Sequence, residues 1–501
     1  MPEKQVQLSK TRFISGCQCP LKLWFDVNQR SLAEPPDASR EALFAAGHVV
    51  GELAQRRWPG GVLVDIAPWL REEAAQFTLS LVDDEDVSAI YEAGISFQRV
   101  LTRVDVLARA PGGQWDLIEV KRSTRVKPPF DTDVALQYWI LKGAGFSVRK
   151  AGVLVLNRDY VYKGGEHDLQ KLFRFEDLTA DCIARLDEIG EKVAEQQKML
   201  GRRHQPAVSM GEQCTTPYTC DYMDHCGQGL KKPANPVSLL PRLQSKRIDE
   251  LQAQGIEAVE DIPADYALTE TQERVRTCIV TGRPWVSPGL GADLEPMNWP
   301  LYFLDFEAVS IDVPRYAGMR PFDQLPFQFS CHIQEAPGAS LEHREFLAEG
   351  PEDPRRPLAE SLLEVLGQAG SIVVYSGYER RTIRALADWL PELSGELLPL
   401  CDRLFDLLKV MQANYCHPGF GGSYSIKQVL PVMAPEMSYS NMSIADGQAA
   451  GWGWLEMLSA EKAEEKVAQR DALLAYCRQD SLAMVKVLEC LMALAAEGGE
   501  S

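Results

Sequence analysis

The 501-residue sequence lacks the features that mark several common classes of protein. It has no run of about 18 apolar residues, and its first thirty residues carry charge throughout, so neither a transmembrane helix nor a secretion signal is predicted. Internal repeats and low-complexity tracts are absent, which argues against a solenoid and a disordered chain. A P-loop of the form GxxxxGK followed by Ser or Thr is also missing, so the chain should not be an ATP-driven helicase. We therefore expect a globular cytoplasmic protein without a membrane partner.

Positive charge is scarce as well. The net charge is -19, and a surface of that sign repels a polyanion such as nucleic acid. The deficit is uneven, because residues 1–235 hold 30 Lys and Arg against 32 Asp and Glu, whereas residues 236–501 hold 22 against 39. The first part of the chain is therefore the better docking surface for nucleic acid.

The chain is too long for one hydrophobic core, so two or three domains are expected. Residues 231–236 form a Pro-rich joint, and residues 282–300 are rich in Gly and Pro. We predict a first domain at 1–232, a connector of short helices at 233–295 and a last domain at 296–501. Both large domains are predicted to be α/β with mixed sheets.

Hydrophobic periodicity predicts the main elements. In the first domain we expect strands at 96–108, 115–120 and 151–157 and a helix at 131–144, with a Pro-Gly-Gly turn at 111–113. In the last domain we expect strands at 301–304, 325–333 and 371–375 and helices at 357–368, 380–390 and about 461–496.

Three charged residues lie on neighbouring predicted strands of the first domain. Glu119 and Lys121 flank one residue, so their side chains share a face of the strand, and a hairpin can bring Asp105 beside them. Two carboxylates form a hard-oxygen site for Mg²⁺ or Mn²⁺, and a nearby lysine can orient water or stabilise phosphate charge. An ordinary surface Glu–Lys pair is the alternative for an E-x-K triplet.

The arrangement D-x13-E-V-K resembles the RecB-like branch of the PD-(D/E)xK nucleases. The resemblance implies that Asp105, Glu119 and the carbonyl of Val120 hold metal, while Lys121 assists hydrolysis. It covers roughly residues 8–230.

Two further parts of the sequence carry this resemblance. His48, in FAAGHVVGELA, matches an upstream histidine that often joins the metal shell in that family, although a lone helical histidine can also be structural. Gln137 and Tyr138 follow on the next predicted helix, where such enzymes approach DNA, so the resemblance implies that both contact nucleic acid.

Twelve cysteines without a secretion signal are not expected to form disulfides. Cys214, Cys220 and Cys226 are closely spaced, which indicates thiolate ligation of a soft metal or cluster. A fourth ligand would come from Cys17 or Cys19. The remaining cysteines are interpreted as buried thiols: Cys182, Cys278, Cys331, Cys401, Cys416, Cys477 and Cys490.

The segment CPLKLWF around Cys19 resembles the first cluster cysteine of iron–sulfur RecB-like nucleases, which include AddB-type and CRISPR-associated enzymes. In that group one N-terminal and three C-terminal cysteines hold a 4Fe-4S cluster that joins the two ends of the domain. The resemblance therefore implies Cys19, Cys214, Cys220 and Cys226 as ligands. A four-cysteine structural zinc site is the alternative.

A second acidic constellation lies in the last domain. Asp305 and Glu307 leave one face of a buried strand, and burying both without a cation would be costly. Tyr476 and Asp480 are one helical turn apart near the C-terminus. These motifs resemble the DEDD exonucleases of the DnaQ, RNase H-like group, in which four acidic residues bind two metal ions and the tyrosine orients water.

The middle motif of that group departs from its usual pattern here. Glu379, in VVYSGYERRTIRAL, stands where an aspartate is expected, which puts the metal geometry in doubt. Asp406 is an additional candidate for the site, and its alternative interpretation is an aspartate at a strand end or helix start.

The loop at 421–427 is rich in small and hydroxyl residues. Ser425 and Lys427 could hold a phosphate or a terminal base, whereas Ser423 or Ser425 could simply cap a helix. This part of the chain resembles a bacterial family that joins a RecB-like domain to a following RNase H-like domain.

The expected function is that of a metal-dependent DNA nuclease, processing single-stranded DNA or free DNA ends in repair or defence. One alternative is a nucleic-acid-binding scaffold with one degenerate site, and another is an exonuclease acting on RNA. A helicase or recombination partner is compatible with this function, but no residue pattern identifies one.

Overall fold

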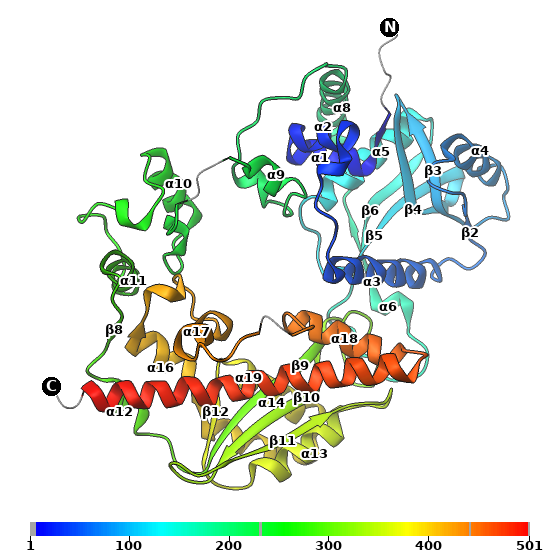
Figure 1. Cartoon of the computed structure of the whole chain (residues 1–501). Helices are drawn as coiled ribbons and strands as arrows, with labels where there is room; N and C mark the ends of the chain where they lie inside the picture. The colour runs from blue at the N-terminus through cyan, green and yellow to red at the C-terminus, as the bar shows by residue number, and fades with distance from the viewer. Residues whose placement is uncertain (1–6, 230–232, 440–441, 499–501) are drawn as a thin grey trace. The chain divides into compact units, whose positions relative to one another are not determined.

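The computed structural model describes residues 7–229, 233–439 and 442–498 (Figure 1). It divides into two compact units, the first formed by residues 1–230 with 311–323 and the second by residues 231–310 with 324–501. Each unit combines helices with a mixed β-sheet, which confirms the α/β prediction. Residues 231 and 232, which belong to the predicted joint and domain boundary, lie outside the described residues. No helix in the described residues has both the length and the apolar character needed to cross a bilayer.

The first unit is built on a seven-stranded sheet. Its main path runs in the order β2 (Val62–Leu63), β3 (Ala89–Phe97), β4 (Val100–Ala110), β5 (Gln114–Lys121), β6 (Val148–Leu156) and β7 (Phe173–Asp177), and β1 (Leu8–Ser9) pairs with β4. Strands β3, β4 and β5 form an antiparallel meander, whereas β5 and β6 are parallel. Helix α5 (Phe130–Gly143) makes the crossover between these parallel strands, as such connections require.

One predicted strand is divided in the structure. Residues 96–108 contain the end of β3, a turn and most of β4. Gln98 and Arg99 both have positive φ, 45° and 62°, which is the conformation of a tight two-residue hairpin turn. The sequence prediction missed this turn because neither residue is the Gly, Asn or Asp that usually marks it. The predicted turn at Pro111–Gly113 is confirmed.

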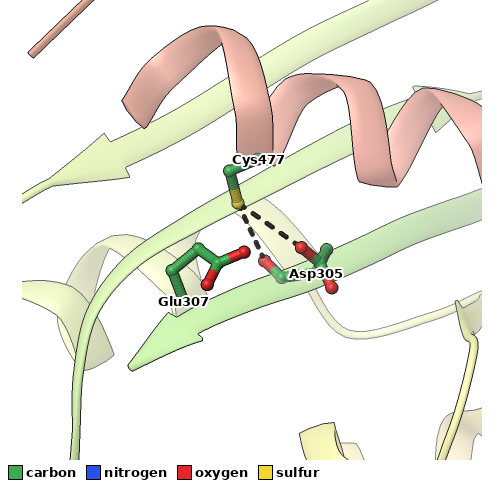
Figure 2. A group of neighbouring side chains, drawn as sticks. All are labelled: Asp305, Glu307 and Cys477. Atoms are coloured by element: carbon green, nitrogen blue, oxygen red, sulfur yellow. Dashed lines mark hydrogen bonds between the residues drawn. The ribbon is translucent and has the colours of Figure 1, made fainter. Parts of the chain in front are cut away.

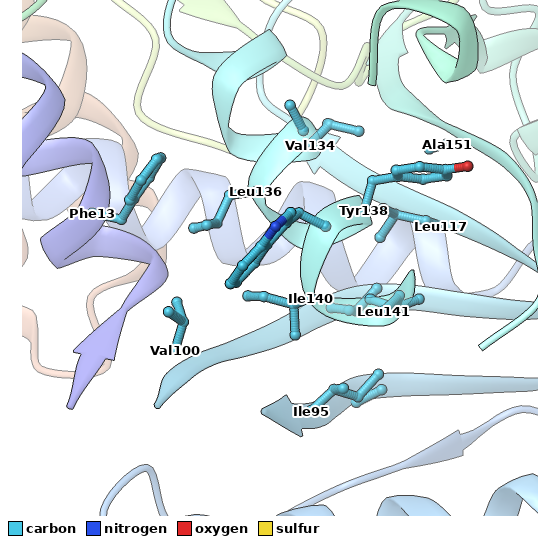
Figure 3. Close-up of a cluster of buried hydrophobic side chains, with 14 of the residues drawn as sticks. Phe13, Ile95, Val100, Leu117, Val134, Leu136, Tyr138, Ile140, Leu141 and Ala151 are labelled. Atoms are coloured by element: carbon cyan, nitrogen blue, oxygen red, sulfur yellow. The ribbon is translucent and has the colours of Figure 1, made fainter. Parts of the chain in front are cut away.

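Two hydrophobic clusters cover the faces of this sheet. Successive strand residues alternate between them, with Leu117 in one cluster and Ile118 in the other. The larger cluster holds α5 and Phe13 of α1 (Lys10–Gln18) against the strands (Figure 3). Every residue of α5 from 133 to 141 is buried, so this helix belongs to the core rather than the surface.

The remaining helices of the first unit flank the sheet or precede the second unit. They are α2 (Pro20–Asn28), α3 (Ala38–Gln55), α4 (Arg71–Val82), α6 (Leu169–Leu172), α7 (Thr179–Ala184), α8 (Leu186–Leu200) and α9 (Met223–Gly227).

The second unit contains a five-stranded sheet with β9 at its centre. The strand order is β11 (Leu341–Leu347), β10 (Asp323–Gln334), β9 (Leu301–Ile311), β12 (Ser371–Val374) and β13 (Leu404–Asp406). Three of these strands were predicted, although β9 extends well beyond residue 304. Strands β11 and β13 were not predicted, since β11 is mostly exposed and lacks an apolar pattern and β13 has only three residues.

Helices surround this sheet. They are α13 (Arg355–Leu366), α14 (Tyr378–Trp389), α15 (Ser394–Leu400), α16 (Leu407–Asn414), α17 (Ile426–Met433), α18 (Gly447–Ser459) and α19 (Ala463–Gly498). The predicted helices at 357–368, 380–390 and about 461–496 correspond to α13, α14 and α19. Short helices α10 (Ser245–Ala253), α11 (Glu270–Thr281) and α12 (Leu290–Leu294) occupy the predicted connector, and strands β8 (Trp285–Val286) and β14 (Tyr415–Cys416) form a small separate pair.

Candidate active sites

The first acidic group lies where β4 and β5 run side by side. Val106 pairs with Ile118 in the antiparallel ladder, so Asp105 lies beside Glu119. The backbone N–H of Val120 donates a hydrogen bond to Oδ2 of Asp105 at 2.7 Å. Glu119 is only 1% exposed. The structure therefore brings together the two carboxylates that the sequence prediction paired.

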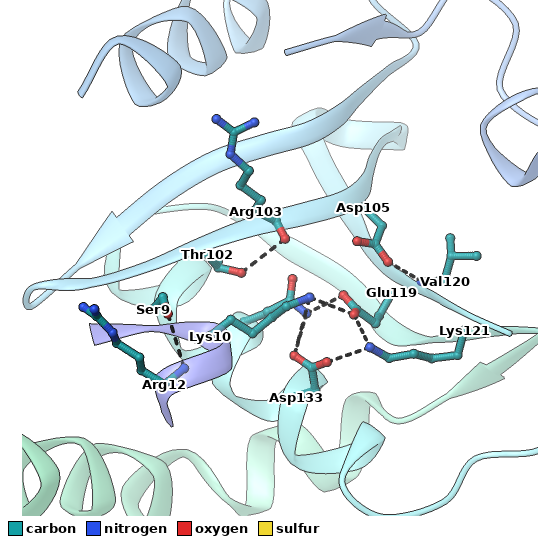
Figure 4. A network of polar contacts seen from close by, with 11 residues as sticks. Ser9, Lys10, Arg12, Thr102, Arg103, Asp105, Glu119, Val120, Lys121 and Asp133 are labelled. Carbon is teal, nitrogen blue, oxygen red and sulfur yellow. Dashed lines mark hydrogen bonds and ion pairs between the residues drawn. The ribbon is translucent and has the colours of Figure 1, made fainter. Parts of the chain in front are cut away.

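Two lysines neutralise this group (Figure 4). Nζ of Lys121 lies 2.5 Å from Oε1 of Glu119 and 2.8 Å from Oδ2 of Asp133. Nζ of Lys10 lies 2.8 Å from the same Glu119 oxygen and 3.7 Å from Oδ1 of Asp133. Lys10 and Asp133 were missed by the sequence prediction. Asp133 lies one turn before Gln137 on α5, but nothing local to Lys10 indicates its position, which follows from the pairing of β1 with β4.

The lysines keep Glu119 charged. Burial favours the neutral acid, but the ammonium groups of Lys10 and Lys121 outweigh it and hold the pKa of Glu119 well below its usual range. Asp105 behaves differently, because burial and then the charge of Glu119 raise its pKa to about 7. The site thus holds one firmly ionised carboxylate and one that titrates near neutrality.

Gln137 and Tyr138 lie inside the domain. Gln137 is fully buried, and its Nε2 donates to Oε2 of Glu119 at 2.6 Å. Tyr138 is 4% exposed within the hydrophobic core. The expectation that these side chains contact nucleic acid does not fit their burial, and the physical reason is that α5 packs on nearly its whole circumference. Gln137 instead holds a carboxylate of the site.

His48 is exposed on α3 and makes no hydrogen bond or ion pair with Asp105 or Glu119. Its charge acts on Glu92, whose pKa is raised by burial while Lys10 and His48 oppose the rise. Glu92 has a φ of 54° and falls opposite Asp105, where the ladder between β3 and β4 skips one pair. Glu92 is therefore a further carboxylate near this site that the sequence prediction did not include.

The four predicted cluster cysteines meet in one place. They line one small cavity, formed in part by Cys19, Cys214, Cys220 and Cys226. Cys17 does not line this cavity and instead accepts a hydrogen bond from Gln196. The amide of Gln18 donates to the carbonyls of Gln213 and Tyr218, at 2.8 and 2.7 Å, which joins the two distant segments. Burial raises the pKa values of Cys220 and Cys226.

The second acidic group lies between β9, α14 and α19. Burial raises the pKa of Asp305 well above its usual range, with further contributions from the charges of Asp480, Glu307 and Glu379. Burial also raises the pKa of Glu307 to about 8 and that of Glu379 to about 7. The structure therefore brings all four predicted carboxylates together, and Glu379 contributes its charge despite its extra methylene.

A thiol belongs to the same group (Figure 2). Cys477 Sγ lies 3.6 Å from Oδ2 of Asp305 and 3.8 Å from its backbone oxygen. Among the described residues, Asp305, Glu307 and Cys477 are the three that bring metal-type ligand atoms within 4.8 Å of one another. The interpretation of Cys477 as an ordinary buried thiol therefore needs correction. Its position three residues before Asp480 on α19 was the available signal.

Aromatic residues and a lysine surround the second group. Tyr439 donates a hydrogen bond of 2.5 Å to Oδ1 of Asp480, and this residue was not predicted. Tyr476 is 3% exposed, and Nζ of Lys427 lies 4.9 Å from its ring centre. Lys427 itself donates to the carbonyl of Ala445. Its positive charge acts to lower the pKa of Asp480, although burial raises that pKa overall.

Two candidate residues lie at helix starts. Asp406 ends β13, and its side chain accepts a hydrogen bond from the backbone N–H of Lys409 at the start of α16. Ser425 occupies the N-cap position of α17 without a side-chain capping bond, and its own N–H donates to Oγ of Ser423. Asp406 thus caps a helix, whereas Ser425 stands at a cap position without making the capping bond.

The comparison with known families covers part of the second unit. Residues 302–425 match a family model described as a domain of unknown function, DUF2779. The match contains Asp305, Glu307 and Glu379 and ends before Tyr476 and Asp480. No curated protein matches the chain. The chemistry of these residues is therefore the basis for assigning a function.

Proposed function

We propose that the chain is a divalent-metal-dependent nuclease that hydrolyses DNA phosphodiester bonds at two sites. The observation that carries this proposal is the convergence of four carboxylates in the second unit: Glu307, Glu379 and Asp480 are buried, and Asp305 is partly buried. Within the described residues, no Lys, Arg or His forms an ion pair with Asp305, Glu307, Glu379 or Asp480. Like charges held together in a buried site require either protons or bound cations.

The donor set of the second site fits the divalent ions of the DnaQ-like resemblance. Asp305, Glu307, Glu379 and Asp480 would hold Mg²⁺ or Mn²⁺, which when bound neutralise phosphate charge and activate water. The Tyr476 hydroxyl would orient a water molecule, as in the DnaQ-like resemblance, and Tyr439 donates a hydrogen bond to one oxygen of Asp480. The mixed five-stranded sheet, with β9 at its centre, is compatible with an RNase H-like frame.

The first site supports the RecB-like resemblance in a different way. Asp105, Glu119 and the carbonyl of Val120 would hold the ion. Lys121, which pairs with Glu119, would orient water or stabilise phosphate charge, and Gln137 donates a hydrogen bond to Glu119. Lys10 adds a second ammonium group on the same carboxylate.

The four-cysteine cavity supports a 4Fe-4S cluster rather than zinc. Zinc–sulfur bonds of about 2.3 Å in a tetrahedron place the sulfurs roughly 3.8 Å apart. Within the described chain, no three of these sulfurs lie within 4.8 Å of one another. A cluster, which carries its ligands at separate iron atoms, accepts wider spacing. Cys19 rather than Cys17 is the proposed N-terminal ligand.

The nuclease proposal is tested with protein purified without oxygen and end-labelled single-stranded DNA, double-stranded DNA and RNA, each with Mg²⁺ or Mn²⁺. Glu119→Gln and Asp305→Asn should each lower one cleavage activity by about 100-fold or more, because each removes a central charge. Matched controls are Asp116→Asn and Glu342→Gln, whose carboxylates form ion pairs with Arg149 and Arg344 away from the sites. Cleavage that is identical in all variants would belong to a contaminant.

A nucleic-acid-binding scaffold is the second candidate. It is favoured by Glu379 in place of the expected aspartate and by the strongly acidic second part of the chain. A scaffold would bind DNA or RNA through the first unit while Asp305→Asn changed neither Mn²⁺ binding nor cleavage. We propose end processing in repair or defence as the role, and no residue pattern supports a helicase or recombination partner.

A further inference from the structure

We propose that Cys477 is a metal ligand of the second site and makes this site select a borderline ion, such as Zn²⁺ or Co²⁺, over Mg²⁺. This inference deepens the proposed function, because it names the ion that the site takes. The sulfur and the carboxylate oxygens of Asp305 and Glu307 provide three ligand atoms within 4.8 Å of one another. That spacing suits a single ion.

Glu307 supplies an independent observation. It is 5% exposed, and it makes no hydrogen bond or ion pair with any described residue. Figure 2 shows its carboxylate on the same side of β9 as the Asp305 side chain, directed toward the Cys477 sulfur. A buried carboxylate without a partner is costly, so its orientation toward two other ligand atoms indicates a site for a cation.

The position of Cys477 is set by α19. Cys477 and Asp480 are three residues apart, so both side chains project from one helix face toward β9. Two other cysteines of the second unit have no such surroundings. Cys490, half-buried on the same helix, contacts the carbonyl of Met433, and the buried Cys331 contacts a backbone carbonyl in β10. The thiol is therefore specific to the acidic group.

Ligand softness gives the preference for the ion. Mg²⁺ takes oxygen ligands almost exclusively, whereas thiolate favours Zn²⁺ and related transition ions. Binding through sulfur releases the thiol proton to solvent as the metal–sulfur bond forms. Replacing sulfur by a hydroxyl should remove the preference and leave the oxygen ligands in place.

The test uses Co²⁺ alone as the probe, added without oxygen to the full chain with its cysteine cavity loaded. The absorption of the proposed cluster is removed by subtracting the spectrum recorded before Co²⁺ is added. In this difference spectrum, the wild-type protein should show a thiolate-to-cobalt absorption band that is missing from Cys477→Ser. Cys477→Ser should weaken Co²⁺ and Zn²⁺ binding by at least about 10-fold and change Mg²⁺ binding by less than about 2-fold. Cys490→Ser is the control on the same helix and should retain the band.

Glu307→Gln guards against a folding artefact, because it retains the sulfur. It should weaken Co²⁺ binding yet keep the sulfur band at saturation. An equal band in wild type and Cys477→Ser, or an unchanged ratio of Co²⁺ to Mg²⁺ affinity, overturns the inference while the nuclease proposal survives. The opposite outcome is a sulfur band without any DNA cleavage. It would support Cys477 as a metal ligand and contradict the DNA nuclease proposal.

Discussion

The two acidic sites differ in how their charge is balanced. In the first unit, Lys10 and Lys121 both contact Glu119 and keep it ionised. In the second unit, the pKa values of Glu307 and Glu379 are raised. When no cation is bound, these carboxylates therefore bind protons near neutral pH. Glu119 of the first site is therefore charged before metal arrives, whereas Glu307 and Glu379 of the second site exchange protons for metal.

This difference separates two ways of burying carboxylates. Paired ammonium groups hold the first site in one geometry, and removing one partner leaves an uncompensated buried charge. The second site keeps its negative charges available for ions, at the expense of stability near neutral pH. The following predictions test this contrast, from the largest effect to the smallest.

The largest effect is expected from Cys19→Ser. Helix α1 begins at Lys10 and ends one residue before Cys19, so loss of the proposed cluster should release the helix that carries the lysine paired with Glu119. First-site cleavage should fall by about 100-fold or more, together with iron content and visible absorbance, while second-site cleavage persists. Cys17→Ser is the matched control. Zinc in place of iron in the purified protein would contradict the cluster.

Removing a lysine should make the first site resemble the second. Lys121→Met leaves Glu119 and Asp133 with one fewer ammonium group, which should destabilise the metal-free first unit by about 3–5 kcal/mol. The pKa of Glu119 should rise, and cleavage should depend more steeply on pH. Chemical denaturation and a pH–rate profile measure these changes, with Lys142→Met at the end of α5 as control. Unaltered stability would show that the ion pairs of Lys121 with Glu119 and Asp133 do not stabilise the first unit.

The metal-free second unit should lose stability as pH rises. The folded pKa values of Glu307 and Glu379, about 8 and 7, exceed the usual value for an unfolded glutamate. The folded state therefore binds more protons, so its stability is complete below the unfolded pKa and is lost as pH rises through 7 and 8.

Denaturation between acid and alkaline pH should reveal a decline of several kcal/mol. Saturating Mn²⁺ should flatten it, and so should Glu307→Gln, whereas Glu342→Gln should not. A profile that rises with pH would contradict the proton-for-metal exchange.

The smallest effect is expected from Tyr439→Phe. This change removes the hydroxyl donor to Asp480 and leaves the ring, so second-site cleavage should fall by about 3- to 10-fold, as for one lost hydrogen bond. Tyr424→Phe, which loses a bond to the carbonyl of Tyr415, is the control for general destabilisation. Equal effects of the two changes on cleavage would mean that Tyr439 acts only through stability.

The residues that lie on strands of both sites were predictable from sequence, because side chains alternate between the two faces of a strand. Glu119 with Lys121, and Asp305 with Glu307, needed only the period of a strand. The helical pair Tyr476 and Asp480 followed equally from a period of one turn.

Residues delivered by tertiary structure were not predictable in this way. Lys10 reaches Glu119 across more than a hundred residues, through the pairing of β1 with β4. In the sequence, only its spacing from Asp480 separates Cys477 from the other cysteines interpreted as buried thiols. The packing of α19 against β9 brings its sulfur close to Asp305. Gln137 and Tyr138 were expected at a surface, because local sequence does not reveal that α5 is covered on nearly all sides.

Helix α1 also fixes when the first site can be assembled during protein synthesis. Its first residue, Lys10, is made early, but the last of the proposed cluster ligands, Cys226, leaves the ribosome only after the whole first sheet. A chain that stops short of this residue cannot anchor α1 through the cluster. On the proposed function, an unfinished polypeptide would thus lack a competent first nuclease site, which spares the cell from cleavage by truncated products.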